Sequence, residues 1–418
     1  GTTAEVNCCF RYAWECLSRL GVNEVGERFI AITDPGTPLQ ELAENHHFRA
    51  IFLADPAVGG RYSALTMFGL LPAALLGVSL PAFLKSAQEM RAICGATIPA
   101  GRNPGLVLGA IIGEAYLQGK DKLTILTDEK WASFGSWLEQ LIAESSGKEG
   151  KGILPIDQEP ILPTDGYAQD RIFVYLRLDG KEDERIEALK KAGHPCLVIP
   201  VIGDYAIAEQ FYQWEFATAT ACAILGVNAF DQPNVQDSKA RTIEKIKQVE
   251  KTGELEIPQP LWENANFQVF SKQALQVSSA TLGDLIAQFL SEVQQNEYIA
   301  INAFVERNAD NHEILKTIRA HIAKQYQVAT TLGYGPRFLH STGQIQKGGK
   351  NNGYFLVLSM NAKEDIPIPG MVISFQQMLL AQALGDIEAL EAAKRRVFYI
   401  YSKKSDLGLL CDAFSSIA

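Results

Sequence analysis

The sequence is poor in the residues of metal and disulfide chemistry. Its 418 residues include 6 histidines and 7 cysteines, and neither set shows the paired spacing of a metal site. An odd number of cysteines is more typical of free thiols in a reducing compartment than of a disulfide framework. We therefore expect a cytoplasmic protein with buried thiols. The seven cysteines are Cys8, Cys9, Cys16, Cys94, Cys196, Cys222 and Cys411.

The chain also lacks an excess of positive charge. Its 38 Lys and Arg residues are outnumbered by 48 Asp and Glu, which gives a formal net charge of -10 at pH 7. This balance argues against nucleic acid as a partner and fits a protein that handles small molecules. The same composition, 47% hydrophobic and 21% charged, supports large cores and two or three domains.

A third absence is that of an unbroken hydrophobic span. The stretch 64–84 carries no charge and has the length of a membrane helix. Four helix-breaking or polar residues interrupt it, namely Pro72, Gly77, Ser79 and Pro81. We expect a helix over 63–76, a second helix that begins near Leu80, and no membrane as a partner.

Short β-rich runs alternate with helical patterns along the chain. The expected strands are 28–33, 49–54, 122–127, 171–178, 196–201, 298–305, 354–359 and 397–401. The expected helices are 4–20, 63–76, 81–94, 104–118, 131–145, 182–192, 206–225, 282–295, 312–326 and 374–384. Strands separated by helices of this length favour the α/β class, with doubly wound parallel sheets that carry helices on both faces.

The alternation suggests several domains. Residues 1–100 are expected to form the remainder of a first α/β domain and residues 101–250 a second one. The polar, weakly periodic stretch 251–280 is interpreted as a linker or a surface excursion. Residues 281–418 then form a C-terminal α/β region. In doubly wound sheets ligands bind outside the carboxyl ends of the strands, where the loops described next are expected.

One carboxylate, Glu144, lies at the end of an expected helix. The helix 131–145 would place its apolar side chains in a core and leave Glu144 beside a glycine-lysine loop. Burial there can raise the pKa of a carboxylate and make it a useful general base. The alternative is that Glu144 caps the helix or pairs with Lys148 or Lys151 on a solvated loop.

Two loops have the composition of anion sites. In VGGRYS at 58–63, Gly59 and Gly60 would let the backbone approach a ligand while Arg61 projects from near a helix N-terminus. In GTTAE at 1–5, Thr2 and Thr3 can donate hydrogen bonds to a phosphate at a helix N-terminus. The alternatives are a glycine turn with a surface Arg and an ordinary Thr N-cap.

A third loop, FDQPNVQDSK at 230–239, begins with a turn-forming Asp-Gln-Pro. That turn would orient the next helix so that Gln232 and Lys239 face inward. The alternative is that Lys239 is a surface lysine in a charged helix.

These segments together resemble phosphoglucose isomerases. The matching stretches are QLIAESSGKEGKG at 140–152 and the GTTAE, VGGRYS and FDQPNVQDSK motifs, which occur in the family's order and cover most of the chain. GYGPRFLHSTGQIQKGG at 333–349 is typical of the bifunctional transaldolase/phosphoglucose isomerase branch. GTTAE resembles the second half of a phosphate-binding loop. We therefore expect an N-terminally truncated part of a longer protein, with a transaldolase upstream.

The resemblance implies a role for each motif. Glu144 would transfer the proton, Arg61 would stabilise the enediolate, and Lys239 would open the sugar ring. Thr3 corresponds to the threonine that holds the sugar phosphate. The substrate-binding residues that the resemblance implies are Thr2, Thr3, Gly59, Gly60, Gln140, Gln232 and His340.

The chain departs from the family at one catalytic position. Most phosphoglucose isomerases carry a ring-opening histidine shortly before the DQP turn, whereas the matching stretch 208–213 reads AEQFYQ and has Glu209 in its place. A carboxylate with a raised pKa could substitute, or His340 could enter the site. The alternative for His340 is a structural histidine in a glycine-rich loop.

The resemblance therefore implies reversible isomerisation of glucose 6-phosphate and fructose 6-phosphate through a cis-enediolate. The expected partner is a small-molecule sugar phosphate, with no metal or organic cofactor, and a homo-oligomer stays open. One alternative is a sugar-phosphate-binding module of the same fold without catalysis. Another is an isomerase that also accepts mannose 6-phosphate.

Overall fold

The computed structural model describes residues 3–417, and the chain divides into two compact units. Unit 1 comprises residues 1–104, 203–215 and 365–375. Unit 2 comprises residues 105–202, 216–364 and 376–418. The expected α/β class is confirmed, because parallel sheets with connecting helices occur in both units.

Unit 1 is built around a small parallel sheet. Strands β1 (Ile30–Thr33) and β2 (Ala50–Leu53) pair in parallel along their full length. Phe10 of the first helix contacts the rings of Phe29 and Phe48, which flank these strands. The helices of this unit are α1 (Ala4–Arg19), α2 (Pro38–Asn45), α3 (Met67–Leu75) and α4 (Leu80–Ile93).

The uncharged stretch 64–84 forms two helices, as expected. Helix α3 ends at Leu75, and Gly77 adopts a φ of 83° before α4 begins at Leu80. Ser79 and Pro81 lie at the start of α4, where a proline is tolerated. Among residues 3–417, no helix has both the length and the apolar character needed to cross a bilayer.

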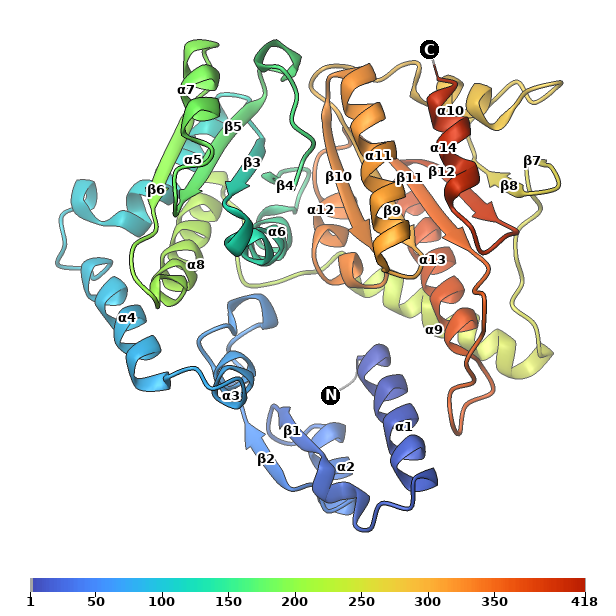
Figure 1. The fold of residues 1–418 in the computed structure, drawn as a ribbon, viewed down its shortest axis with the longest axis horizontal. Coiled ribbons are helices and arrows are strands. Elements are labelled where there is room, and N and C mark those ends of the chain that lie inside the picture. The colour runs from blue at the N-terminus through green and yellow to red at the C-terminus, as the bar shows by residue number, and fades with distance from the viewer. Residues whose placement is uncertain (1–2, 418) are drawn as a thin grey trace. The chain divides into compact units, whose positions relative to one another are not determined.

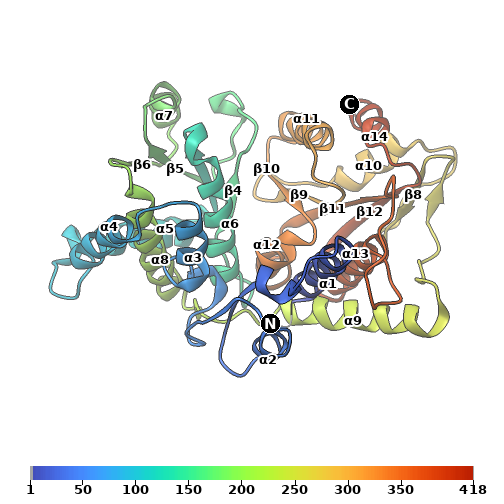
Figure 2. The same cartoon turned by 60° about the horizontal axis from the view of Figure 1, so that its bottom comes forward.

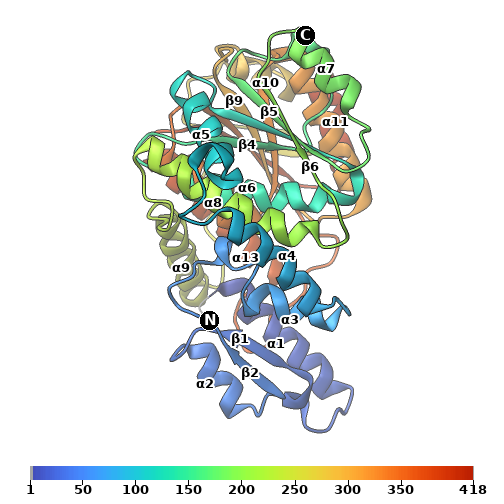
Figure 3. The ribbon, with the colours of Figure 1, turned by 90° about the vertical axis from the view of Figure 1, so that its left-hand side faces the viewer.

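Unit 2 contains a four-stranded parallel sheet in the order β4-β3-β5-β6. Helix α6 connects β3 to β4, which lies toward one edge of the sheet. Helix α7 connects β5 to β6, which lies toward the opposite edge. Right-handed crossovers in opposite directions place α6 and α7 on opposite faces, which is the doubly wound arrangement (Figure 3). The strands are β3 (Lys122–Thr127), β4 (Leu154–Asp157), β5 (Arg171–Arg177) and β6 (Cys196–Pro200). The helices are α5 (Pro104–Leu117), α6 (Ala132–Ser146), α7 (Asp183–Lys191) and α8 (Ala206–Leu225). The part of α8 before Phe216 belongs to unit 1 and the rest to unit 2.

A glycine stripe lets α5 lie close to the second half of α8. A Cβ added at Gly109 would come within 2.4 Å of a backbone oxygen, that of Ala217. One added at Gly113 would meet the Ile224 side chain at 2.9 Å. These contacts are too short for real Cβ atoms, so the helix packing itself requires glycine here.

The second sheet of unit 2 has six strands in the order β10-β9-β11-β12-β8-β7 (Figure 1). The first four are parallel, whereas β8 pairs antiparallel with β12 and β7 pairs antiparallel with β8. The strands are β7 (Trp262–Glu263), β8 (Phe267–Phe270), β9 (Tyr298–Phe304), β10 (Ala329–Tyr334), β11 (Gly353–Met360) and β12 (Arg396–Ser402). The helices are α9 (Val235–Thr252), α10 (Leu282–Leu290), α11 (Ala309–Tyr326), α12 (Thr342–Gly348), α13 (Phe375–Ala392) and α14 (Gly408–Ser415).

Alternating side chains of β9 show how this sheet is covered. Ile299 and Ile301 belong to a core formed with α10, α11 and α14. Ala300 and Phe304 belong to the opposite core, which is formed with α12 and α13. Figure 2 shows the two helical layers on either side of the sheet. Both faces of β9 are buried, so its sequence is apolar at every position except Asn302 rather than alternating.

The stretch 251–280 differs from the expected linker. It contains β7 and β8, and Phe267–Phe270 pairs with Tyr399–Ser402 of β12. Phe267 and Val269 are buried in the core of the sheet. The stretch therefore extends the second sheet, and the weak periodicity of its sequence comes from two very short strands separated by turns.

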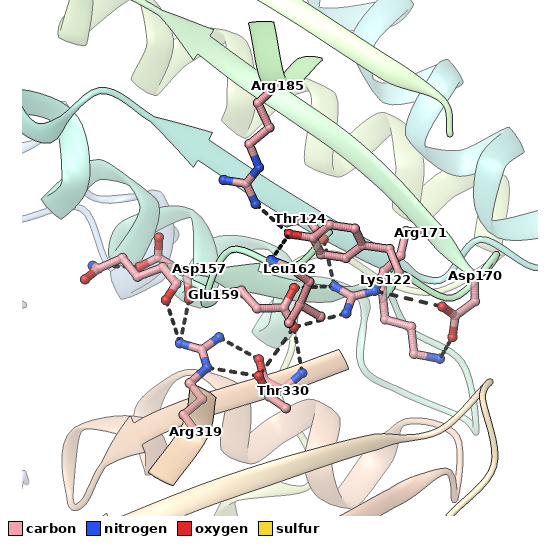
Figure 4. A network of polar contacts seen from close by, with 12 residues as sticks. Lys122, Thr124, Asp157, Glu159, Leu162, Asp170, Arg171, Arg185, Arg319 and Thr330 are labelled. Atoms are coloured by element: carbon pink, nitrogen blue, oxygen red, sulfur yellow. Dashed lines mark hydrogen bonds and ion pairs between the residues drawn. The ribbon is translucent and has the colours of Figure 1, made fainter. Parts of the chain in front are cut away.

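The two sheets of unit 2 are joined by a buried polar network (Figure 4). Glu159, just after β4, forms a bidentate ion pair with Arg171, with N–O distances of 2.7 and 3.0 Å. It also accepts a hydrogen bond from the backbone of Thr330 in β10. Arg319 of α11 donates to the carbonyls of Asp157 and Gln158, both at 3.0 Å. Most of these charges and carbonyls satisfy one another where the two sheets meet, although the Nε of Arg171 is buried without a hydrogen bond.

Candidate active site

Glu144 lies in the last turn of α6, as expected, and its residue is 8% exposed. Gln140, one turn earlier, donates to its Oε2 at 3.4 Å. The two lysines that could have neutralised it bond elsewhere. Lys148 contacts Asp231 at 2.8 Å, and Lys151 donates to the carbonyl of Leu225 at 2.9 Å. The structure therefore disfavours the solvated-loop interpretation of Glu144.

The loop after Glu144 is pinned by close contact with α12. A Cβ added at Gly147 would lie 2.3 Å from the Cα of Ile345. One added at Gly348 would lie 2.5 Å from the carbonyl oxygen of Gly147. Gly150 donates a backbone hydrogen bond to the Gly348 carbonyl at 2.9 Å. The glycines of SSGKEGKG and IQKGG are thus required because two backbones touch there.

Gln344 of α12 connects the Glu144 loop to the DQP turn. Its side-chain nitrogen donates to the carbonyl of Gly147 and to the side-chain oxygen of Asn234, both at 2.8 Å. Its side-chain oxygen accepts from the backbone nitrogen of Asn234 at 3.0 Å. Gln344 is fully buried. One amide therefore fixes the Glu144 loop and the DQP turn relative to each other.

Lys148 makes a second connection between the same two loops. Its ammonium contacts the Asp231 carboxylate and donates to the Asn228 carbonyl. The lysine is 3% exposed, whereas the Asp231 side chain is 54% exposed. The Glu144 loop, the DQP turn and α12 consequently form one hydrogen-bonded assembly within unit 2.

Replacing Gln344 with Leu is expected to lower turnover roughly 10- to 100-fold, because small displacements of catalytic groups are costly. The unpaired Gly147 and Asn234 groups should also destabilise the fold by about 1–3 kcal/mol. Gln346→Leu is the matched control. Gln346 is equally buried on the same helix, but it bonds to Asn302 instead of to the loops. Steady-state kinetics and urea unfolding of both variants test the assignment. Equal losses of turnover in the two variants would contradict it.

Arg61 of unit 1 is buried, with 2% of its surface exposed, and its guanidinium lies 5.4 Å from the centre of the Tyr62 ring. It belongs to a short 3₁₀ helix, Gly60–Tyr62. Among the described residues, a Cβ at Gly59 or Gly60 would meet no atom within 4 Å, and neither glycine has a positive φ. Neither crowding nor backbone conformation in unit 1 therefore requires glycine at these two positions.

Glu209 lies in the first turn of α8 and accepts a hydrogen bond from the Ser86 hydroxyl of α4 at 2.8 Å. The residue at the histidine position is therefore held by a neighbour in unit 1. Thr3 is the N-cap of α1 and makes no side-chain capping bond. Thr2 lies outside the described residues.

The expected inward orientation of Lys239 is wrong. Lys239 lies on α9 with an exposed side chain, whereas its neighbour Ser238 is 4% exposed and is hydrogen-bonded to Asp386. The buried stripe of α9 runs through Val235, Ser238, Thr242 and Val249, which places Lys239 on the flank of the helix. Gln232 and His340 are both partly buried.

Sequence reasoning missed Gln344 and Lys148 as parts of the site. A usable signal was present in both motifs, because closely spaced glycines flank each residue. Such spacing indicates close backbone approach. The motif 333–349 was noted only through His340, whereas its contacts with the loops come from its second half, α12.

No family model matches this sequence. Curated relatives do. The chain is 30% identical over 285 residues to a glucose-6-phosphate isomerase of Leptospira biflexa, which covers 57% of this chain and 62% of the relative. It is 29% identical over 286 residues to the enzyme of Parabacteroides distasonis and 26% identical over 282 residues to that of Enterococcus faecalis, in each case with 57% of this chain and 63% of the relative covered.

Over these residues the chain is similar to glucose-6-phosphate isomerases. It spans about three-fifths of the length of the curated relatives that it matches. Among solved structures, a glucose-6-phosphate isomerase from Chlamydia trachomatis aligns with 58% of this chain and 56% of its own length, at 18% identity and a TM-score of 0.45.

The residues singled out in the sequence fall in both units. Glu144, Gln140, Lys148 and Gln344 are organised within unit 2, and Arg61 and Glu209 are organised within unit 1.

Proposed function

We propose that this chain interconverts glucose 6-phosphate and fructose 6-phosphate. The observation that carries the proposal is Glu144, a buried carboxylate at the end of α6 whose neighbouring loop is clamped by Gln344. The family context of the curated relatives supports the choice of substrate. The seven free cysteines support a reducing compartment, and we assign the protein to the cytoplasm.

In the proposed mechanism Glu144 removes the proton from carbon 2 of the open-chain aldose and returns it to carbon 1 through a cis-enediolate. Arg61 stabilises the negative charge that develops on the enediolate oxygens, a contribution of about 3 kcal/mol per donor in comparable sites. The reaction moves one proton from carbon 2 to carbon 1 and one from the oxygen on carbon 2 to the oxygen on carbon 1, and it redistributes electrons within the sugar. It therefore proceeds by acid-base chemistry of these side chains.

Ring opening is proposed to use Glu209, which occupies the position of the family's histidine. Its carboxylate can exchange a proton with the ring oxygen or the anomeric hydroxyl, and Ser86 orients it. The role of Lys239 in this step rests on the resemblance alone, since its side chain is exposed. Thr3, Gly59, Gly60, Gln140, Gln232 and His340 stay proposed substrate contacts.

The second candidate is a sugar-phosphate-binding module without catalysis. The replacement of histidine by Glu209 is the observation that favours it, because that position carries the ring-opening step in the family. An isomerase that also accepts mannose 6-phosphate differs from the main proposal only in discrimination at carbon 2. Association with an upstream transaldolase is a separate proposal that rests on the 333–349 motif.

A coupled assay tests the function. Full-length protein is expected to convert fructose 6-phosphate to glucose 6-phosphate, detected through glucose-6-phosphate dehydrogenase, while mannose 6-phosphate reports on specificity at carbon 2. Tight binding of fructose 6-phosphate without turnover would support the binding module instead. Absence of both binding and turnover would reject the family function for this chain.

A further inference from the structure

Unit 2 has a solvent-open pocket that the proposed isomerase mechanism does not use. It encloses about 610 Å³, including its open mouth, at the junction of the two sheets. Its wall contains Asp157 at the end of β4, Tyr334 at the end of β10 and Arg307 three residues after β9. Ligands of α/β proteins bind at carboxyl ends of strands, which is where this pocket lies.

The pocket has an excess of positive charge. Four cationic side chains line it, whereas only two carboxyl groups, those of Glu139 and Asp157, do so. Burial raises the pKa of Glu139 to about 7 and also raises the pKa of Asp157. The negative charge of the wall is therefore further reduced near neutral pH. The four cationic residues are Arg307, Lys316, Arg319 and Arg337.

Two of these cationic residues, Arg319 and Arg337, are held by hydrogen bonds to neighbouring protein groups. Arg319 is buried and uses its guanidinium on Thr330 and on the carbonyls of Asp157 and Gln158, as Figure 4 shows. Arg337 donates to the Ser136 carbonyl at 2.8 Å and lies 3.5 Å from the Glu139 carboxylate. These residues shape the pocket and contribute charge.

The other two cations can meet a ligand. Within residues 3–417, no carboxylate lies at ion-pair distance from Arg307, whose guanidinium stacks 5.3 Å from the centre of the Tyr334 ring. Lys316 pairs with Glu313 at 3.0 Å, but both side chains are more than half exposed, and such a pair exchanges readily with solvent and ligands. An anion at the mouth would gain charge-assisted hydrogen bonds from both residues.

The inner end of the pocket has different chemistry. The carboxyl of Glu139 accepts from the Ser341 hydroxyl at 3.2 Å, and the carboxylate of Asp157 accepts from the Ser136 hydroxyl at 3.1 Å. Each of these carboxyl groups has oxygen lone pairs left for further donors. Hydroxyl groups of a ligand are suitable donors, whereas a second anionic group would be repelled. The pocket thus matches a molecule with an anionic end and a hydroxylated end.

We propose that this pocket is a second ligand site, which binds a phosphorylated polyol or sugar with its phosphate at Arg307 and Lys316 and its hydroxyl groups near Glu139. The site is distinct from the Glu144 loop, because Glu144 does not line the pocket and Glu139 lies more than one helical turn before it on α6. The inference does not depend on the proposed isomerase function.

Calorimetric titration of the full-length protein with sorbitol 6-phosphate tests the proposal. The parent should bind it at this site with one binding equivalent, in addition to any equivalent at the isomerase site. The double variant Arg307→Ala/Lys316→Ala should lose that equivalent or bind it roughly 100-fold more weakly. Inorganic phosphate should compete for the same equivalent, and sorbitol without phosphate should not bind.

Lys324→Ala is the matched control. Lys324 is an exposed lysine in the last turn of α11, the helix that carries Lys316, and it lies outside the pocket. Its removal takes one positive charge from the same helix, half the change in the double variant, and should leave the titration unchanged. The proposal is overturned if the double variant keeps the parent's stoichiometry and affinity, or if sorbitol binds as well as its phosphate. Isomerase activity of the double variant should equal that of the parent, which separates the two sites.

Discussion

Replacement of Glu144 with Gln is expected to lower isomerase turnover about 10²- to 10⁴-fold, the usual contribution of a positioned general base. Gln keeps the shape of the side chain and its hydrogen bond to Gln140, but it cannot accept the carbon-2 proton. Binding of fructose 6-phosphate and the midpoint of urea unfolding should stay near those of the parent. Turnover by the coupled assay and binding by calorimetry give the two readouts.

Glu149→Gln is the control for this variant. Glu149 lies in the same loop, five residues further on, with an exposed side chain. Its substitution removes one carboxylate from the motif without touching the buried position, so the rate should be unchanged. If Glu144→Gln retains the parent's turnover, or if both variants lose it equally, Glu144 is not the base.

Replacement of Asp386 with Asn is expected to destabilise the protein by about 3–5 kcal/mol, the cost of leaving a buried charge without its partner. Lys347 of α12 contacts Asp386 of α13 at 2.5 Å, and their side chains are 3% and 0% exposed. Asp386 also accepts from Ser238 of α9 at 3.3 Å, so the pair connects three helices. Urea unfolding at neutral pH measures the loss.

Two further variants separate burial from charge pairing. The double variant Lys347→Met/Asp386→Leu removes both charges and should recover most of the lost stability, because apolar replacement of a buried pair is often neutral. Glu187→Gln breaks an exposed pair with Lys190 at 2.8 Å, and it should cost at most about 1 kcal/mol. A loss below that level for Asp386→Asn would show that the buried pair does not hold α12 in place.

Much of the fold follows from periodicity. Helix α8 and strand β3 begin and end where the sequence predicts, because a long apolar helix and a buried parallel strand both leave strong patterns. Strand β4 escaped prediction since it is four residues long and contains Pro155. Strand β8 is also only four residues long. Its pairing with β12 depends on residues far apart in sequence, so the sequence did not predict it.

The sequence predicted only part of the candidate site. Burial of Glu144 follows from the apolar stripe of α6, which was visible in the sequence. The orientation of Lys239 was mistaken because a turn fixes where a helix starts but not its rotation, which the stripe through Val235, Ser238 and Thr242 determines. The clamp by Gln344 depends on three segments that meet only in the folded chain, and no local pattern specifies such a contact.

The most direct test of the central claim is isomerisation of fructose 6-phosphate by the full-length protein in D₂O, followed by NMR of the product. A proton transfer through Glu144 predicts deuterium at carbon 2 of the glucose 6-phosphate formed, because the carboxyl proton exchanges with solvent before it is returned. Complete conversion without any deuterium at carbon 2 would indicate a direct hydride shift and would contradict the assignment of Glu144 as the base.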